Sequence, residues 1–292
     1  MRKGGIRSVK RKKRIIKPKA KIFLFLLLFL ISLVGYRIIL HQTESELVTQ
    51  KVGSDLENNH STVVNSIQKQ LEQFALKDKR ITKIIQNIEE YPSEILEMLV
   101  RNIDMTDYVL DFLNKKGQVY ADTIGKVTKG EYPLLLQYDK RWGYGIYGDN
   151  VIAVNGCGPT VLSMVIAGLT GRNDITPYKI ANDAKKKGYY KEGSGTSWRF
   201  MTNGVKEYGI RGIEISLNQS IMVRELKKGH PIVCSMRKGD FTTTGHFILL
   251  VGIQEGKFIV RDPNSKERSQ KLWSYETLQG QIRNLWSFQI DG

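Results

Sequence analysis

The chain has 292 residues, and 45 Lys and Arg residues against 29 Asp and Glu residues give it a formal net charge of +16. Its hydrophobic content of 41% and charged content of 25% exclude a wholly disordered chain and a collagen-like repeat. Two cysteines and four histidines are too few for a disulfide-based scaffold, a cysteine-rich zinc module or a multi-histidine metal centre, so no cofactor or metal is expected.

Much of the positive charge lies in residues 1–21, which hold eleven Lys or Arg residues and no acid. The remaining residues carry only 16 − 11 = +5. A basic arm of this kind can bind nucleic acid by neutralising phosphates. Here it directly precedes the apolar run 22–40, IFLFLLLFLISLVGYRIIL. Basic residues in that position are typical of a signal that sets the orientation of a membrane segment. We therefore expect no nucleic-acid partner and interpret residues 1–21 as a cytoplasmic tail.

The apolar run has the length of a membrane span, because its nineteen residues would rise roughly 28 Å as a helix, close to the ~30 Å hydrocarbon core. Basic residues before a first apolar segment stay in the cytoplasm, so everything after Leu40 is expected outside the cell. The alternative is a cleaved secretory signal, but the run continues into bulky residues without a small-residue cleavage site. The expected protein is a single-pass membrane protein with residues 41–292 extracellular.

Residues 41–130 are mostly polar, with apolar residues at helical or heptad spacing from Val64 to Ile88. Two heptads are too few to predict a coiled coil. Ser93 can begin one short helix, and Thr106 or Asp107 can begin another that ends at Gly117. We expect a helical stalk and lead-in, which either holds the next domain away from the membrane or mediates self-association.

Residues 131–292 predict one α+β domain with a largely antiparallel sheet. Helices are expected over 161–169, 176–188, 198–208 and 221–228, the second with Thr176 as its N-cap and Gly188 as its end. Strands are expected over 230–236, 246–253, 257–262 and 285–290. A tight turn at 254–256 joins the middle two strands as a hairpin.

Cys157 lies directly before an apolar helix, in the segment Asn155-Gly156-Cys157-Gly158-Pro159. The free N–H groups and partial positive charge of a helix N-terminus favour the reactive thiolate. The flanking glycines would also let a substrate backbone come close. The alternative is a small buried hydrophobic residue, which is the interpretation for Cys234 inside a predicted strand.

Thiol catalysis requires a base, usually histidine, and a third group that orients it. His246 begins a predicted strand. If paired residues of the hairpin sum to about 510, Asp262 lies near Ile248 and Leu249 and Asn264 near His246, so either could orient the histidine. His230 precedes a proline at a strand start, so a structural role is expected. Gln137, twenty residues before Cys157, carries an amide that could stabilise an oxyanion.

Several motifs occur together in a fixed order: Gln137 with Trp142-Gly143, GCGPT around Cys157, GxxW at 195–198, Gly245-His246, and Arg261-Asp262-Pro263. This set resembles the papain-fold cysteine peptidases of the bacteriocin-processing, double-glycine leader peptidase family, and specifically their membrane-anchored, free-standing members from Gram-positive bacteria. The resemblance covers residues 91–288, including the helical lead-in.

The resemblance implies a papain-like fold, with Cys157 as nucleophile, His246 as general base and acid, Asp262 as its orienter and Gln137 as oxyanion donor. The substrate would be a peptide or protein. An ATP-driven export function is not expected, because the chain has no phosphate-binding G-x-x-x-x-G-K-[ST] motif. The G-x-G-x-x-G pattern at 143–148 follows no apolar strand, so a loop beside the active site is expected there instead of a dinucleotide site. Two alternatives stay open: a cell-wall amidopeptidase, and a catalytically inactive binding module.

Overall fold

The computed structural model describes residues 29–30, 32–38, 40–43, 45, 62–193 and 195–291. The basic tail 1–21 lies outside these residues, and the expected membrane segment 22–40 lies partly outside them. Among the described residues no helix is both long and apolar enough to span a bilayer. The chain divides into two compact units, Met1–Val63 and Val64–Gly292, and the second contains both the fold and the site.

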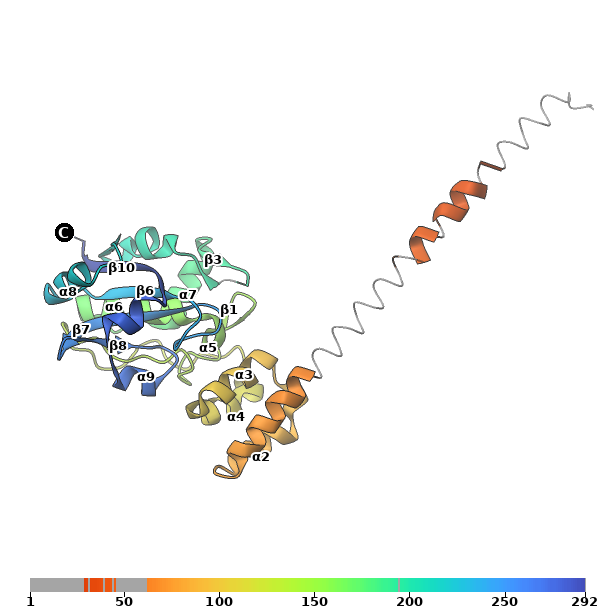
Figure 1. The fold of residues 1–292 in the computed structure, drawn as a ribbon, viewed down its shortest axis with the longest axis horizontal. Helices are drawn as coiled ribbons and strands as arrows, with labels where there is room; N and C mark the ends of the chain where they lie inside the picture. The colour runs from red at the N-terminus through yellow and green to blue at the C-terminus, as the bar shows by residue number, and fades with distance from the viewer. Residues whose placement is uncertain are drawn as a thin grey trace, which may run out of the picture. The chain divides into compact units, whose positions relative to one another are not determined.

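The second unit begins with a group of short helices, coloured orange to yellow in Figure 1. A helix over 62–75 is followed by α2 (Arg80–Gln86), α3 (Ser93–Arg101) and α4 (Thr106–Lys115), with 3₁₀ turns at Ile88–Glu90 and Ile103–Met105. The two short helices expected from Ser93 and from Thr106 are present. Gly117, where the second was expected to end, has φ +87°, a conformation that favours glycine. We call residues 64–116 the helical lead-in.

The apolar residues at heptad spacing pack within the chain itself. Val64, Leu71 and Ile84 are buried in one cluster with Tyr108 of α4, and the same cluster includes Tyr144 from the expected peptidase domain. This cluster therefore joins residues from both sides of the boundary expected between residues 130 and 131. From residue 64 onward the chain is part of this packed unit and not an extended stalk, because its apolar face is covered by its own neighbours.

Three helices follow: α5 (Ile152–Asn155), α6 (Cys157–Thr170) and α7 (Pro177–Lys186). The expected helix at 161 begins earlier, at Cys157, and ends at Gly171 with φ +77°. At the start of α7 the Thr176 hydroxyl accepts a hydrogen bond from the N–H of Lys179, which satisfies a free amide of the first turn as the sequence indicated.

A six-stranded antiparallel sheet in the order β5-β10-β6-β7-β8-β9 confirms the predicted α+β class. Its strands are β5 (Ile210–Glu214), β6 (Ile232–Met236), β7 (His246–Gln254), β8 (Lys257–Arg261), β9 (Leu272–Trp273) and β10 (Ile282–Ile290). Two small ladders pair β1 (Ile146–Tyr147) with β2 (Asn150–Val151), and β3 (Tyr190–Lys191) with β4 (Gly195–Thr196). Further helices are α8 (Gln219–Lys227), α9 (Lys266–Gln270) and α10 (Tyr275–Gln279).

Two sequence expectations differ from the structure. The expected helix over 198–208 is a π-helical turn (Phe200–Gly204) followed by a 3₁₀ turn (Lys206–Tyr208). Strand β5 was not expected, because it is an edge strand in which only Ile210 and Gly212 are buried. Such a strand lacks the apolar run that marks the central strands.

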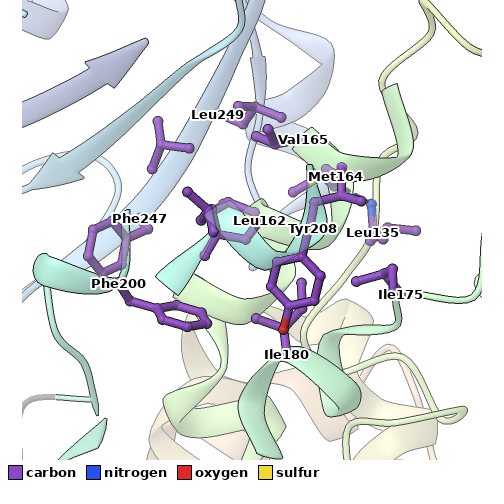
Figure 2. Close-up of a cluster of buried hydrophobic side chains, with 14 of the residues drawn as sticks. Leu135, Leu162, Met164, Val165, Ile175, Ile180, Phe200, Tyr208, Phe247 and Leu249 are labelled. Atoms are coloured by element: carbon purple, nitrogen blue, oxygen red, sulfur yellow. Dashed lines mark hydrogen bonds between the residues drawn. The ribbon is translucent and has the colours of Figure 1, made fainter. Parts of the chain in front are cut away.

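Both faces of the sheet are covered. On one face Val233, Leu249 and Trp286 belong to the core that contains α6, and Figure 2 shows side chains of this cluster, including Leu162 and Val165 of α6 beside Phe247 and Leu249. On the other face Ile232, Cys234 and Ile248 pack with Met222 of α8 and Leu278 of α10. Burial on both sides explains why the central strands are continuously apolar and do not alternate.

Candidate active site

Cys157 is the first residue of α6, a helix of 14 residues. Its thiol forms no disulfide and is half-buried, and it lines a cleft that is open to solvent. Because the first N–H groups of a helix have no intrahelical partner, an anion at this position is stabilised by them and by the helix dipole. The location matches the sequence prediction for a reactive thiol.

The glycines on either side of Cys157 have a packing role. A Cβ at Gly156 would lie 2.4 Å from the Ile152 carbonyl oxygen, and a Cβ at Gly158 would lie 2.7 Å from the Thr196 Oγ1. Both distances are shorter than a carbon atom tolerates. The sequence suggested that these glycines admit a substrate backbone, but the structure shows them admitting α5 and β4 against the start of α6.

His246 begins β7 and is 8% exposed. Its Nε2 lies 2.8 Å from Oδ1 of Asp262, whose side chain is fully buried. With Nε2 engaged, Nδ1 is the ring nitrogen left for Cys157, which is near enough to help raise the pKa of the imidazole. The structure thus brings together the three residues that the sequence nominated as nucleophile, base and orienter.

The β7–β8 hairpin selects Asp262 over Asn264 as the partner of His246. Near the turn Gln254 pairs with Lys257, and after an irregularity between Leu250 and Gly252 the pairs sum to 510, as predicted. Asp262 follows β8 opposite Ile248, which lies on the same face of β7 as His246, and diagonal neighbours on one face can touch. Asn264 contributes backbone only: its N–H donates to Asp262 Oδ1 at 2.8 Å, while its side-chain oxygen is buried without a hydrogen-bond partner.

Charge sets the protonation of this pair. Burial by itself lowers the pKa of His246, but the charge and hydrogen bond of Asp262, together with Cys157, raise it from 6.5 to about 9. For Asp262 burial has the opposite effect and raises the pKa of the carboxyl group. The charges and hydrogen bonds of His246 and Arg268 outweigh burial, so the pKa of Asp262 lies below its usual value. At neutral pH the histidine is therefore an imidazolium facing the thiol, and the carboxylate is ionised.

Arg268 of α9 is a site residue that the sequence analysis did not identify. Its Nε lies 2.5 Å from Asp262 Oδ2, so the carboxylate bridges an arginine and a histidine. Ser265 caps α9 by accepting the Arg268 N–H, and this cap helps to fix the helix that carries the arginine. The residues next to Arg268 in the sequence do not indicate this contact, because nothing distinguishes this arginine from the other basic residues of the chain.

Gln137 lies beside the site, and its side-chain amide points toward backbone carbonyl groups. Its own N–H donates to Pro263 O at 2.8 Å, and its Nε2 donates to Ala153 O at 2.5 Å. Its side chain is buried and its Oε1 has no hydrogen-bond partner. The residue therefore connects the segment after Asp262 to the segment before Cys157, and its predicted role as an oxyanion donor stays a prediction.

A cleft of about 830 Å³ opens at the nucleophile and the base, both of which line it. Its wall includes Asp149 and Asn155 on one chain segment, and Trp198 and Arg283 from distant ones. Asn155 Nδ2 donates to Asp149 Oδ1 at 2.7 Å and so holds the 143–150 loop against α5. The G-x-G-x-x-G segment thus leads into this wall, beside the active site as expected.

The remaining candidates have structural roles. His230 Nδ1 lies 2.9 Å from Glu225 Oε2 on α8, as expected for a structural histidine. Cys234 is fully buried in β6, and burial raises the pKa of its thiol. Among the described residues, no group of three or more His, Cys, Asp or Glu side chains is arranged to hold a metal ion.

Comparison with known proteins gives one family and two distantly similar structures. The model of the Peptidase_C39 like family matches residues 129–288, more than half of the chain. Among solved structures, the chain is similar to the peptidase domain of Streptococcus ComA, a bi-functional ABC transporter involved in a quorum-sensing pathway. That match has 20% identity and a TM-score of 0.40 and covers 56% of this chain and 100% of the other.

The chain is also similar to a protein from Bacillus anthracis described as a C39-like peptidase. That match has 15% identity and a TM-score of 0.33 and covers 56% of this chain and 96% of the other. No curated protein matches the chain. Likenesses this distant carry no argument about the chemistry of the site, which depends on the residues described above.

Proposed function

The chain belongs to the Peptidase_C39 like family, and on that premise we propose that it is a cysteine peptidase whose nucleophile is Cys157. One observation carries the proposal: His246 lies between Cys157 and the buried Asp262, and the thiol and the imidazole line the same cleft. A lost nucleophile or base would have favoured a binding module, and neither is lost.

The mechanism that fits this arrangement is acyl transfer. The Cys157 thiolate attacks the carbonyl carbon of the scissile bond, and the resulting oxyanion accepts a hydrogen bond from the Cys157 backbone N–H at the start of α6. The His246 imidazolium then donates its proton to the leaving amine as the C–N bond breaks. Water, deprotonated by the now neutral His246, attacks the thioester, and the acid product leaves as the thiol is regenerated.

The site is further proposed to act outside the cell, on a peptide or protein substrate, from a single-pass anchor at residues 22–40. The support is the order of the chain: eleven basic residues precede an apolar run of spanning length, and the peptidase follows it. Labelling of intact cells with an impermeant thiol reagent would test this orientation, since a cytoplasmic Cys157 would stay unlabelled until the cells are lysed.

Selective alkylation tests the chemistry. Iodoacetamide at pH 6 should label Cys157 far faster than Cys234, because only the former lies at a helix N-terminus beside an imidazolium and opens to a cleft. Cys157→Ala should reduce hydrolysis of a fluorogenic peptide library to background while its unfolding curve stays that of the wild type. Equal labelling of the two thiols, or full activity of Cys157→Ala, would overturn the proposal. Release of muropeptides from purified walls without peptide hydrolysis would favour the amidopeptidase alternative.

A further inference from the structure

The end of α3 in the helical lead-in reaches the loop that carries Asp262. Asn102 is the residue immediately after this helix, and its side-chain Nδ2 donates to the backbone oxygen of Asn264 at 2.7 Å. The two residues are 162 positions apart in the chain, and the contact is partly buried. A hydrogen bond shielded in this way is less weakened by competition with water than an exposed one.

From Asn264 two hydrogen bonds lead to His246, the neighbour of the nucleophile. The N–H of Asn264 donates to Oδ1 of Asp262 at 2.8 Å, and the same oxygen accepts from His246 Nε2 at 2.8 Å. His246 in turn interacts with Cys157. Residue 264 is therefore held through its oxygen by the lead-in while its N–H holds the carboxylate that orients the base.

A neighbouring residue makes a second contact of the same kind. Arg101, the last residue of α3, donates through Nη1 to the Thr243 hydroxyl at 2.8 Å. Thr243 lies in the loop just before His246, and in that loop the Thr242 hydroxyl donates to the Gly245 oxygen. At its other end α3 presents Glu94 to the cleft. One helix thus meets the cleft, the loop before the base and the loop after the carboxylate.

We propose that Asn102 is a positioning residue of the active site, which acts on His246 through Asn264 and Asp262. This inference depends on the proposed peptidase function. It makes the helical lead-in part of the catalytic apparatus: without the Asn102 contact, the 262–265 loop is free to shift, and Asp262 holds the imidazole less well. Small displacements of reacting groups are known to be costly in rate.

Asn102→Ser is the discriminating variant. The serine hydroxyl is too short to reach the Asn264 oxygen, but it can still accept the Asp104 N–H that Asn102 Oδ1 accepts at 3.3 Å, so the following 3₁₀ turn keeps its cap. Asn102→Ala removes both contacts. Asn87→Ser is the matched control, since Asn87 Nδ2 also donates to a backbone oxygen, that of Lys83 at 3.1 Å, but entirely within the lead-in.

Each full-length variant is tested for peptide hydrolysis, for thermal unfolding, and for the pH dependence of Cys157 alkylation by iodoacetate, an anion that the imidazolium attracts. Both Asn102 variants should lower kcat about tenfold with little change in KM. They should also move the alkaline limb of Cys157 alkylation to lower pH, because a looser Asp262 supports the imidazolium less. The charged and titratable groups that face this imidazole are Cys157 of α6, Asp262 after β8 and, through Asp262, Arg268 of α9.

The outcomes separate the two proposals. Wild-type Cys157 that alkylates as an ordinary thiol would overturn the peptidase function itself, and this readout needs no substrate. Enhanced wild-type reactivity with an unchanged pH profile and kcat in Asn102→Ser would overturn the positioning role alone, even if that variant melts at a lower temperature. A shift in Asn102→Ser that Asn87→Ser does not share supports it.

Discussion

At the residue scale the site depends on one buried carboxylate with three partners. Asp262 accepts hydrogen bonds from His246, from Arg268 and from the N–H of Asn264. A buried carboxylate is tolerated only when it is paired and fully hydrogen-bonded, and this one is. The arrangement fixes the imidazole through Nε2 and keeps it protonated over the neutral range, which is the state a thiolate nucleophile requires.

The raised pKa of His246 predicts how activity and stability depend on pH. Peptide hydrolysis should fall near pH 9, where the imidazolium that acts as general acid is lost. Alkylation of Cys157 by iodoacetate should slow over the same range, because the positive imidazolium no longer attracts this anionic reagent. Since the folded-state pKa lies above the ordinary value of 6.5, the pair contributes its full stability below about pH 6.5 and loses it as the pH rises through about 9.

Asp262→Asn tests which part of this effect is charge. The asparagine oxygen can still accept the Nε2–H bond, so the ring stays oriented, but the charge that opposes burial is gone. The alkaline limb of Cys157 alkylation should move from about 9 to clearly lower pH. Asp183→Asn on α7, whose carboxylate accepts from the Tyr208 hydroxyl at 2.7 Å, is the control and should leave the limb unchanged. An unshifted limb in Asp262→Asn would show that Asp262 does not set the protonation of His246.

At the element scale the decisive feature is the start of α6. Gly156 and Gly158 let α5 and Thr196 of β4 approach the first turn, and Cys157 is held between them. Thr196 is fixed from the other side by the Tyr147 hydroxyl at 2.8 Å. The position of the thiol therefore depends on the absence of two side chains as much as on any contact that it makes itself.

Gly158→Ala should destabilise the protein by about 1–3 kcal/mol, the usual cost of overpacking a buried site, because the new methyl group would overlap the Thr196 side chain. Urea unfolding measures the loss. The double variant Gly158→Ala with Thr196→Ala should recover part of it, since the second change removes the nearest atom, Thr196 Oγ1, together with Cγ2, and leaves only the Cβ at 2.8 Å. If the single and double variants lose equal stability, the steric explanation is wrong.

At the scale of the whole molecule, the lead-in and the domain that carries the candidate site share a core. The rings of Tyr108 and Tyr144 stack at 4.4 Å with an interplanar angle of 7°. The Tyr108 hydroxyl donates to Gly143 O at 3.0 Å, and the Tyr144 hydroxyl donates to Tyr108 O at 3.2 Å. Val151 and Ala153, just before the nucleophile, are buried in the same cluster. Residues from 64 onward thus form one structural unit.

A truncation series follows from this. A fragment of residues 64–292 should unfold in one cooperative transition, whereas a fragment of residues 117–292 should aggregate or melt without cooperativity, because Tyr144 and Val151 would lose their cover. Circular dichroism and gel filtration report the difference. Equal melting temperatures for the two fragments would show that the lead-in is an independent appendage.

By itself the sequence determined the features that depend on short stretches of chain. The α+β class, the helix that begins near Cys157, the β7–β8 hairpin and the placing of Asp262 and Asn264 near His246 follow from periodicity, capping residues, a tight turn and a register counted from that turn. The preference for Asp262 came from the family resemblance. These signals are local, because hydrogen bonds within a helix or hairpin join residues close in sequence.

Only the tertiary structure decided the rest. It showed the Arg268 bond to Asp262, the contact of Asn102 with Asn264, the inward turn of Gln137 and the burial of the heptad face from Val64 within its own chain. The choice of Asp262 over Asn264 also needed coordinates, since the counted register leaves both residues near His246 and only the structure shows whose side chain bonds it. All of these contacts have the same physical reason: each depends on packing between elements that are far apart in the chain. The type of a residue does not specify which distant residue it will contact.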